Sequence, residues 1–557
     1  MANTSVTGLN SGMQWDETVK LLMELERKPV VLLEQRKSAY QSQLTNWSGI
    51  ESRLSSLKSA ADSIESADEM LTKSISASDD TILTATADST AIEGSHQILI
   101  NQLATNHIIV HTTGWADRYN TPVNNSGVEQ SFSYSYAGEN ITVAAPDGTT
   151  LAGLAKLINN DPDNPGVVAS ILNDGSGGAS AYHLVLSGKD TGEDNTITII
   201  DTVDNPTDLS DGDDFDPSEW NVTQTAQNAE LRVDGFPDPD WGWPNPWIES
   251  DSNDVKDIIP GVTLHLQNVS PTDPIQIEIS LNKADVKAKV NTFIKAFNDL
   301  ISTVNSLTSH NVETETSGPL ANDSVARTFR SMFTALVSET VPGMDESDRY
   351  RSLGEVGVKV TSGGTLKLDS SKFDEALSTD AEAVARLFVY DSVSSSTFVS
   401  AVGHGDNTVG GSYDFTISYD ADGVILPNGT NTIGGENASV QGDTIISGAE
   451  DSPSEGLLLL LNNPGDGPGS LSGTMKVYTG VAAMLSAKIN DLTDSIDGRV
   501  TLNRKRIKDQ MDSLNDRIDA WDERLTKIEE AYNKKFLAME TLIGQLKTQS
   551  NYLSGVF

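Results

Sequence analysis

Apolar residues recur along the last quarter of the chain at alternating steps of three and four positions. Their average period of about 3.5 residues is typical of a coiled-coil seam, and no proline interrupts residues 481–557. The seam contains one additional four-residue step at Tyr532, which locally unwinds a supercoil. We predict a long helix that needs a partner helix, because it cannot bury this stripe against itself. The seam positions are Ile507, Met511, Leu514, Ile518, Trp521, Leu525, Ile528, Tyr532, Phe536, Met539, Ile543 and Leu546.

The other end of the chain supplies a second amphipathic segment. A first helix is expected from just after Ser11 to about Arg27, and a longer one from Pro29, a residue type that the first turn of a helix tolerates. We predict that the apolar face of the longer helix and the C-terminal seam bind partners. Two interpretations stay open: a bundle that joins the termini within one chain, or contacts with neighbouring subunits of an assembly. The predicted positions on the longer helix are Leu44, Trp47, Leu54 and Leu57.

Between these ends the apolar period changes from 3.6 to 2, which is the alternation of β-strands. A single helix is expected at residues 151–159, among loops rich in Gly, Asn, Asp and Ser. The predicted strands are residues 81–87, 96–103, 107–113, 132–136, 140–144, 183–186, 196–200, 229–233, 262–266 and 275–280.

Helical spacing returns at residues 284–307, with further helices at 323–339 and 372–389 and a strand pair around 354–368. The predicted fold is α+β and multidomain: long coiled-coil termini form a leg, and nested β-rich domains project from it. The expected domains are a terminal leg region (1–40 and 505–557), a helical leg domain (41–78, 284–390 and 476–504), a β-rich domain (79–112 and 226–283), a nested β-rich outer domain (113–225) and an extra β-rich insert (391–475).

The net charge of −42 is unevenly distributed. Residues 1–70 carry 7 basic and 10 acidic side chains, and residues 481–557 carry 12 of each, which leaves 19 basic and 58 acidic side chains in the middle. A surface this acidic repels phosphates and anionic lipids. We therefore expect no nucleic-acid partner and no membrane insertion.

The chain contains no cysteine, which excludes disulfides, thiolate catalysis and cysteine-ligated metals. It has no run of 18 apolar residues that could span a bilayer. Residues 1–13 are polar and lack the features of a cleaved signal peptide. We expect this segment to be flexible.

Two groups of residues are of types that bind metal ions, but their spacing does not fit a metal site. Asp211, Asp213, Asp214 and Asp216 suggest a calcium loop, but Gly212 is misplaced for an EF-hand, so an acidic solvated loop is favoured. His107 and His111 would ligate one metal only if they lay on a helix, and their context predicts a strand. The sequence predicts no metal site.

Trp241, Trp243 and Trp247 lie in a proline-rich segment. Exposed aromatic rings could stack on sugars or on a partner protein, whereas buried rings would pack a small lobe. Residues 188–189 lack the upstream glycine of a phosphate loop, and no local motif places a nucleophile beside a base. We therefore expect neither an enzyme nor a cofactor.

Several short motifs, in order along nearly the whole chain, resemble the flagellar filament-capping protein family, also called flagellar hook-associated protein 2. The Trp-rich residues 237–250 and the insert at 391–475 depart from the family pattern. The motifs are GLNSGM (8–13), ILINQLA (98–104), YHLVLSGKDTG (182–192), GPLAND (318–323), SLGEVGV (352–358), GTLKLD (364–369) and FLAME (536–540).

This resemblance implies a structural assembly factor at the distal tip of the bacterial flagellum. Members of the family form a ring, most often described as a pentamer, that promotes flagellin insertion and prevents monomer leakage. The implied partners are other copies of the chain, flagellin, hook–filament junction proteins and an export chaperone. The implied location is extracellular, reached through the flagellar type III export channel without a cleaved signal.

A different function class remains open. Acidic β-rich domains displayed at a filament tip could act as an adhesin that binds surface or host glycans. Loss of filament assembly would indicate a cap, whereas normal filaments with lost attachment would indicate adhesion alone.

Overall fold

The computed structural model describes residues 14–200, 209, 215–243, 245–311, 316–464 and 467–554. The expectations for residues 1–13 and for Asp211, Asp213 and Asp214 lie outside these residues. Asp216, the fourth residue of the calcium hypothesis, is described, and its carboxylate accepts the Ser218 N–H at 2.7 Å. The chain divides into two compact units. The helical unit comprises Met1–Met70 and Lys283–Phe557, and the β-rich unit comprises Leu71–Asn282. Helices and several β-sheets in separate compact units confirm the predicted α+β multidomain class.

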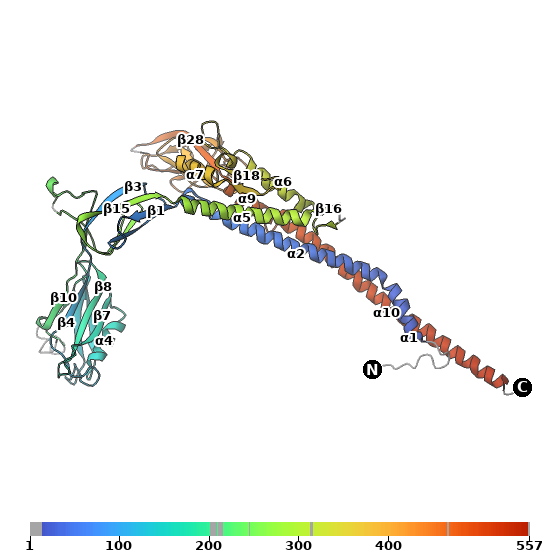
Figure 1. Cartoon of the computed structure of the whole chain (residues 1–557), viewed down its shortest axis with the longest axis horizontal. Helices are drawn as coiled ribbons and strands as arrows, with labels where there is room; N and C mark the ends of the chain where they lie inside the picture. The colour runs from blue at the N-terminus through green and yellow to red at the C-terminus, as the bar shows by residue number, and fades with distance from the viewer. Residues whose placement is uncertain are drawn as a thin grey trace. The chain divides into compact units, whose positions relative to one another are not determined.

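The helical unit is built around α2 (Lys28–Asp62), which packs against α5, α9 and α10 (Figure 1). Helix formation follows the 3.6 period, and the inward stripe of α2 is fully buried at Trp47, Ile50, Leu54 and Leu57. The other helices are α1 (Trp15–Glu26), α3 (Ala67–Met70), α5 (Lys283–Thr308), α6 (Ser324–Ser338), α7 (Ser370–Thr379), α8 (Ala381–Ala385), α9 (Val481–Thr493), α10 (Arg499–Ser554) and the 3₁₀ turn η3 (Leu353–Val356).

The insert in the helical unit is a small two-sheet β-domain. Its sheets have the strand orders β20-β28-β22-β23-β24 and β21-β27-β26-β25, and every pairing is antiparallel. Phe415, Leu459 and Met475 are buried between them. The strands are β20 (Tyr390–Ser394), β21 (Val399–Gly403), β22 (Gly411–Tyr419), β23 (Thr432–Ile433), β24 (Glu436–Asn437), β25 (Ser439–Gln441), β26 (Ile445–Ser447), β27 (Leu458–Leu461) and β28 (Gly469–Thr479).

Two short hairpins complete the helical unit. β16 (His310–Asn311) pairs with β17 (Thr316–Ser317), and β18 (Val358–Val360) pairs with β19 (Leu366–Leu368). The second hairpin is the strand pair that the sequence predicts around 354–368.

The β-rich unit has two cores. The first lies between the sheet β1-β15-β3-β11-β12 and the sheet β13-β14-β2, and it is lined by Ile98, Leu231 and Ile277 among others. Its strands are β1 (Lys73–Ala77), β2 (Leu83–Ala87), β3 (Gly94–Gln102), β11 (Ala229–Val233), β12 (Ile248–Ser250), β13 (Asp254–Lys256), β14 (Val262–Leu266) and β15 (Ser270–Leu281).

The second core is nested within the first along the chain. It lies between the sheet β10-β4-β8-β7, the sheet β6-β5-β9 and helix α4 (Leu151–Asn160), and it buries Phe132, Tyr134 and Tyr136 completely. Thr150 caps α4 by accepting the Gly153 backbone N–H at 3.2 Å. Its other elements are β4 (Asn106–His111), β5 (Gln130–Tyr136), β6 (Glu139–Ala145), β7 (Val167–Asn173), β8 (Tyr182–Thr191), β9 (Ile197–Ile199), β10 (Trp220–Gln224) and η1 (Pro217–Glu219).

Three boundaries differ from those that the pattern predicts. The helical region ends at Met70 and not near residue 78, because β1 pairs with β15 in the β-rich unit. Helix α2 continues unbroken across residues 40 and 41. The single helix predicted at 372–389 is two helices, since Asp380 adopts an extended conformation and its carboxylate caps α8 by accepting the Ala383 N–H at 2.9 Å.

The two histidines of the metal hypothesis have separate roles. His107 Nδ1 accepts the Ile197 N–H at 3.0 Å, and His111 Nδ1 lies 2.8 Å from the Thr113 carbonyl oxygen. Burial lowers the pKa of His107. Within the described ranges, no group of three or more His, Asp or Glu residues could hold a metal ion. No helix in that part of the chain is long and apolar enough to cross a membrane.

Candidate partner-binding surface of the terminal helices

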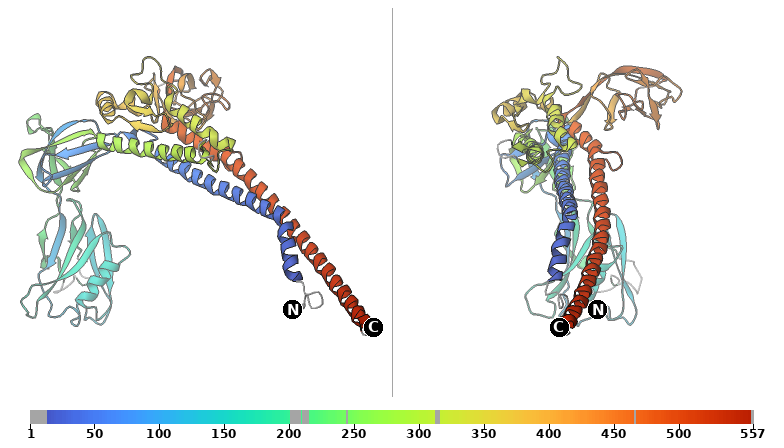
Figure 2. Two further views of the ribbon diagram at one scale, coloured as in Figure 1. Left: turned by 45° about the vertical axis from the view of Figure 1, so that its right-hand side comes forward. Right: turned by 90° about the vertical axis from the view of Figure 1, so that its right-hand side faces the viewer.

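Helix α10 lies antiparallel to α2 along the first part of the seam (Figure 2). Ile507, Leu514 and Leu525 are buried there. The guanidinium of Arg504 forms an ion pair with Glu51 on α2. This half of the seam therefore has an intramolecular partner, as the bundle interpretation predicts.

Asp323 links three helices at the centre of this bundle. Its Oδ2 accepts hydrogen bonds from Trp47 Nε1 of α2 at 3.0 Å and from Asn503 Nδ2 of α10 at 2.8 Å. Its Oδ1 caps α6 by accepting the N–H groups of Val325 and Ala326 at 2.9 and 3.1 Å. Satisfying a buried carboxylate in this way fixes the relative positions of the three helices.

The partner of α10 changes at the additional step of the seam. Tyr532 O–H donates to Glu26 on α1 at 3.3 Å. One turn later, the rings of Phe536 and Trp15 stack with centroids 4.8 Å apart, and Trp15 Nε1 also donates to Glu540. The spacing thus locates the position at which α10 passes from α2 to α1.

Past Glu540, α10 carries apolar side chains that remain exposed. We call residues 541–554 the overhang; at a rise of 1.5 Å per residue it is roughly 21 Å long. Its exposed apolar residues are Leu542, Leu546, Tyr552 and Leu553, with exposed fractions of 56–74%. Leu21 and Leu25 on α1 are similarly exposed. Apolar side chains gathered in this way at the ends of two helices form a candidate contact surface.

The predicted partner-binding residues fall into three groups. The exposed pair is Met539 and Leu546. The exposed residues that the sequence did not predict as partner-binding are Leu21, Leu25, Leu537, Leu542, Tyr552 and Leu553. A second apolar row beside the seam, at Leu537 and Leu542, is the signal that could have found two of them. The buried group is Trp47, Leu54, Leu57, Ile507, Leu514 and Leu525, and the half-buried group is Leu44, Met511, Ile518, Trp521, Ile528, Tyr532, Phe536 and Ile543.

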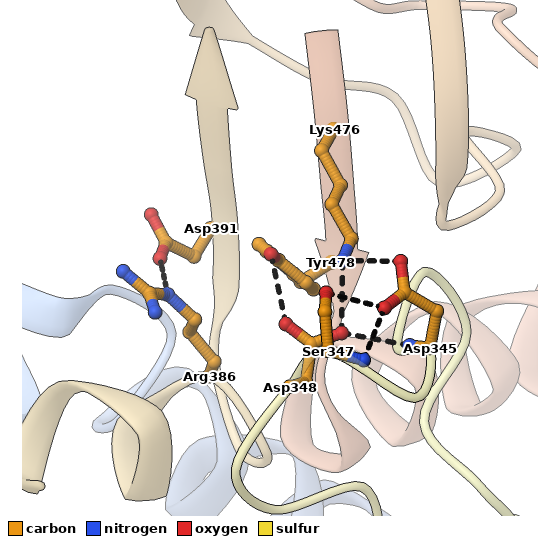
Figure 3. Close-up of polar contacts among 7 residues, drawn as sticks. All are labelled: Asp345, Ser347, Asp348, Arg386, Asp391, Lys476 and Tyr478. Atoms are coloured by element: carbon orange, nitrogen blue, oxygen red, sulfur yellow. Dashed lines mark hydrogen bonds and ion pairs between the residues drawn. The ribbon is translucent and has the colours of Figure 1, made fainter. Parts of the chain in front are cut away.

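A charged cluster joins the insert to the loop after α6 (Figure 3). Lys476 Nζ on β28 lies 2.7 Å from Asp345 Oδ2 and 2.9 Å from Asp348 Oδ2. Tyr478 O–H donates to Asp348 at 3.2 Å, and Arg386 Nε donates to Asp391 at 2.8 Å. The cluster therefore ties one end of the insert to the helical unit.

The electrostatics of this cluster favour the charged forms. The hydrogen bond from Lys476, followed by those from Ser347, holds the pKa of Asp345 well below its ordinary value. Burial opposes the charge on Lys476, but hydrogen bonds to Asp345 and Asp348 outweigh it and raise the pKa of the lysine. These contacts hold β28 to the loop after α6, and we call the cluster the joint.

Comparisons with known proteins agree with this architecture. The model of the flagellar hook-associated protein 2 C-terminus matches residues 226–548, more than half of the chain, and that of the N-terminus matches residues 11–107. The chain belongs to the flagellar hook-associated protein 2 family. Membership confirms the resemblance carried by the sequence motifs.

Relatives in this family are similar over most of their length. The A-type flagellar hook-associated protein 2 of Pseudomonas aeruginosa is 28% identical over 407 residues, which are 70% of this chain and 82% of the relative. The flagellar hook-associated protein 2 of Escherichia coli K12 is 27% identical over 402 residues, 70% of this chain and 81% of the relative. The matches support a flagellar role.

A solved structure of the same family has a similar fold. It contains the D1-D2-D3 domains of the flagellar cap protein FliD from Escherichia coli, with a TM-score of 0.50 and 27% identity. The match covers 61% of this chain and 89% of that one.

Proposed function

We propose that this protein caps the distal tip of a bacterial flagellar filament, where it promotes flagellin insertion and holds back unpolymerised monomers. Family membership and the likeness to a flagellar cap protein support this proposal. The absence of a bilayer-spanning helix in the described ranges is compatible with an exported, extracellular protein. We further propose export through the flagellar type III channel.

The proposed mechanism rests on one observation, the exposed apolar residues of the α10 overhang. A leg formed by α1, α2 and α10 would hold the overhang ready to contact other molecules, and burying each leucine on contact contributes roughly 1.5–3 kcal/mol. The proposed partners are neighbouring copies in a ring, five by analogy with the family, together with flagellin and hook–filament junction proteins. Before export, the same apolar surface would suit an export chaperone.

The test replaces apolar side chains of the overhang without disturbing the bundle. In a strain that lacks its own cap, the variant Leu542→Ser/Leu546→Ser should release several-fold more unpolymerised flagellin into the medium than the unmodified protein. The matched control is Gln545→Ser/Gln549→Ser, which changes exposed polar residues of the same helix segment. Measuring the cap protein in the medium separates a capping defect from an export defect. Wild-type filaments with the leucine variant would refute this use of the overhang.

Adhesion by tip-displayed β-rich domains is a second candidate function. One observation favours it: the rings of Trp241 and Trp243 lie exposed on the β-rich unit. The sequence suggested surface or host glycans as ligands. A strain with Trp241→Ala/Trp243→Ala should keep normal filaments and lose attachment if this function exists.

A further inference from the structure

The loop that connects β11 to β12 exposes three large aromatic side chains. We call residues 234–243 the aromatic loop. Trp241 is 72% exposed, Trp243 50% and Phe236 42%. None of the three belongs to the core of the sheets beside them, which is made by aliphatic residues. Their rings therefore do not stabilise the fold in the way that a buried ring does, and they are available to a ligand.

The aromatic loop is held in one shape by its own hydrogen bonds. The backbone N–H groups of Val233 and Phe236 each donate to the carbonyl oxygen of the other, at 3.0 and 2.9 Å. Asp238 accepts the Asp240 N–H with its carboxylate at 2.9 Å and the Trp241 N–H with its carbonyl at 3.1 Å. Phe236 and Trp243 also pack edge to face, with centroids 5.1 Å apart. A preformed surface of this kind loses little entropy on binding.

The base of the loop already shows one indole occupied by a cation. The guanidinium of Arg232 lies 4.0 Å from the ring centroid of Trp247, and its Nε donates to the Pro246 carbonyl at 2.7 Å. Among the described residues, the cation–π pairs include Trp247 but neither Trp241 nor Trp243. The two exposed indoles thus offer faces of the same kind.

The charge around the rings determines whether a cationic or an anionic ligand is favoured there. No lysine or arginine occurs between Arg232 and Lys256, whereas Asp234, Asp238 and Asp240 belong to the loop itself. The only lysines and arginines of the whole β-rich unit are Lys73, Arg118, Lys156, Lys189, Arg232 and Lys256. Such a field attracts cations to the site and repels anions.

We propose that the aromatic loop is a binding site for arginine or lysine side chains presented by a segment of a partner protein. The indole faces of Trp241 and Trp243 would receive the cation, and the carboxylates of Asp238 and Asp240 would pair with it. Aromatic and carboxylate groups together recognise a cationic side chain better than either does alone. The proposal assigns the adhesion candidate a cationic protein segment in place of a glycan, and it holds or fails independently of the capping function.

Binding is measured on the full chain with a labelled Gly/Ser peptide that carries three arginines, at physiological ionic strength. Trp241→Ala/Trp243→Ala should raise the dissociation constant by about 2- to 30-fold, the range that corresponds to cation–π contacts of about 0.5–2 kcal/mol. Asp238→Asn/Asp240→Asn should also raise it. The matched control is Ile92→Ala, because Ile92 is an equally exposed apolar residue of the same unit.

The Ile92→Ala control separates specific binding from general attraction to an acidic protein, because it has the same net charge as the tryptophan variant. With a peptide that carries citrulline in place of arginine, the tryptophan variant and the control should have the same dissociation constant. Equal dissociation constants for the tryptophan variant and Ile92→Ala would overturn the proposal. So would binding of neutral oligosaccharides that requires both tryptophans and is unchanged by the two Asp→Asn substitutions, since that result indicates a glycan site.

Discussion

The indole of Trp15 stacks on the phenyl ring of Phe536 at a centroid distance of 4.8 Å, with an angle of 25° between the ring planes. This contact fastens α1, near the start of the chain, to the last third of α10. Few other contacts hold α1, whose Leu21 and Leu25 are exposed. At the other end of α1, Glu26 accepts the Tyr532 O–H. A short helix held by a few contacts at its two ends can open locally once one of them is removed.

Replacing Trp15 by alanine should release α1 without unfolding the bundle. The loss includes about 0.5–1.5 kcal/mol for the aromatic pair in addition to the buried area. Hydrogen exchange should accelerate in residues 15–26 and remain unchanged in α5 and α9. Leu21→Ala is the matched control on the same helix, and equal exchange in both variants would contradict the role of the stack.

The bundle should depend strongly on Asp323. Asp323→Ala removes the cap of α6 and leaves the Trp47 Nε1–H without its acceptor, so we expect a loss of roughly 2–4 kcal/mol in unfolding free energy. Chemical denaturation of the full chain measures this change in the free energy of unfolding. Asp369→Ala is a suitable control, because Asp369 caps α7 by accepting the Lys372 N–H but is exposed. Its loss should cost about 1 kcal/mol. A similar loss in both variants would show that the links to α2 and α10 contribute little.

The joint between the insert and the helical unit should weaken in acid. Because the folded-state pKa of Asp345 is lowered, its stabilising effect is complete above the ordinary aspartate pKa of about 3.9 and is lost as the pH falls through the folded-state value. Asp345→Asn should therefore flatten the pH dependence of hydrogen exchange in β28 below about pH 4.

The control for the joint is Lys527→Met on α10. Lys527 forms an exposed pair with Glu523, and such pairs contribute little to stability. This variant should leave exchange in β28 and its pH dependence as in the unmodified protein. A pH profile of Asp345→Asn that matches the unmodified protein would rule out the proposed joint.

The additional step of the seam should be needed for function. Deleting residues 529–532 removes the additional step, so that the alternating steps of three and four continue from Ile528 through Phe536. It also removes the Tyr532 contact with Glu26. We expect α10 to follow α2 further and capping to be impaired, measured as flagellin in the medium. Deleting residues 522–528 shortens α10 by a full heptad and keeps the step, so it should impair capping less.

The sequence alone determined the elements whose signal is local. A period of about 3.5 predicted α10, and periods of about 3.6 and 2 predicted α2, α5 and most strands of the β-rich unit. These signals are local, because side-chain direction depends only on the backbone conformation of neighbouring residues. The order of short motifs was sufficient to indicate the family. Spacing also marked the step at Tyr532, where the structure shows that α10 begins to contact α1.

Tertiary structure decided the features that depend on distant residues. The strand β1 exists because β15 pairs with it, and Asp323 gains its role from Trp47 and Asn503, which lie far away along the chain. The pattern could not tell a seam residue buried by α2, such as Ile507, from an exposed one, such as Leu546. Periodicity gives the direction of a side chain on its own helix, whereas its burial depends on where the covering helix ends.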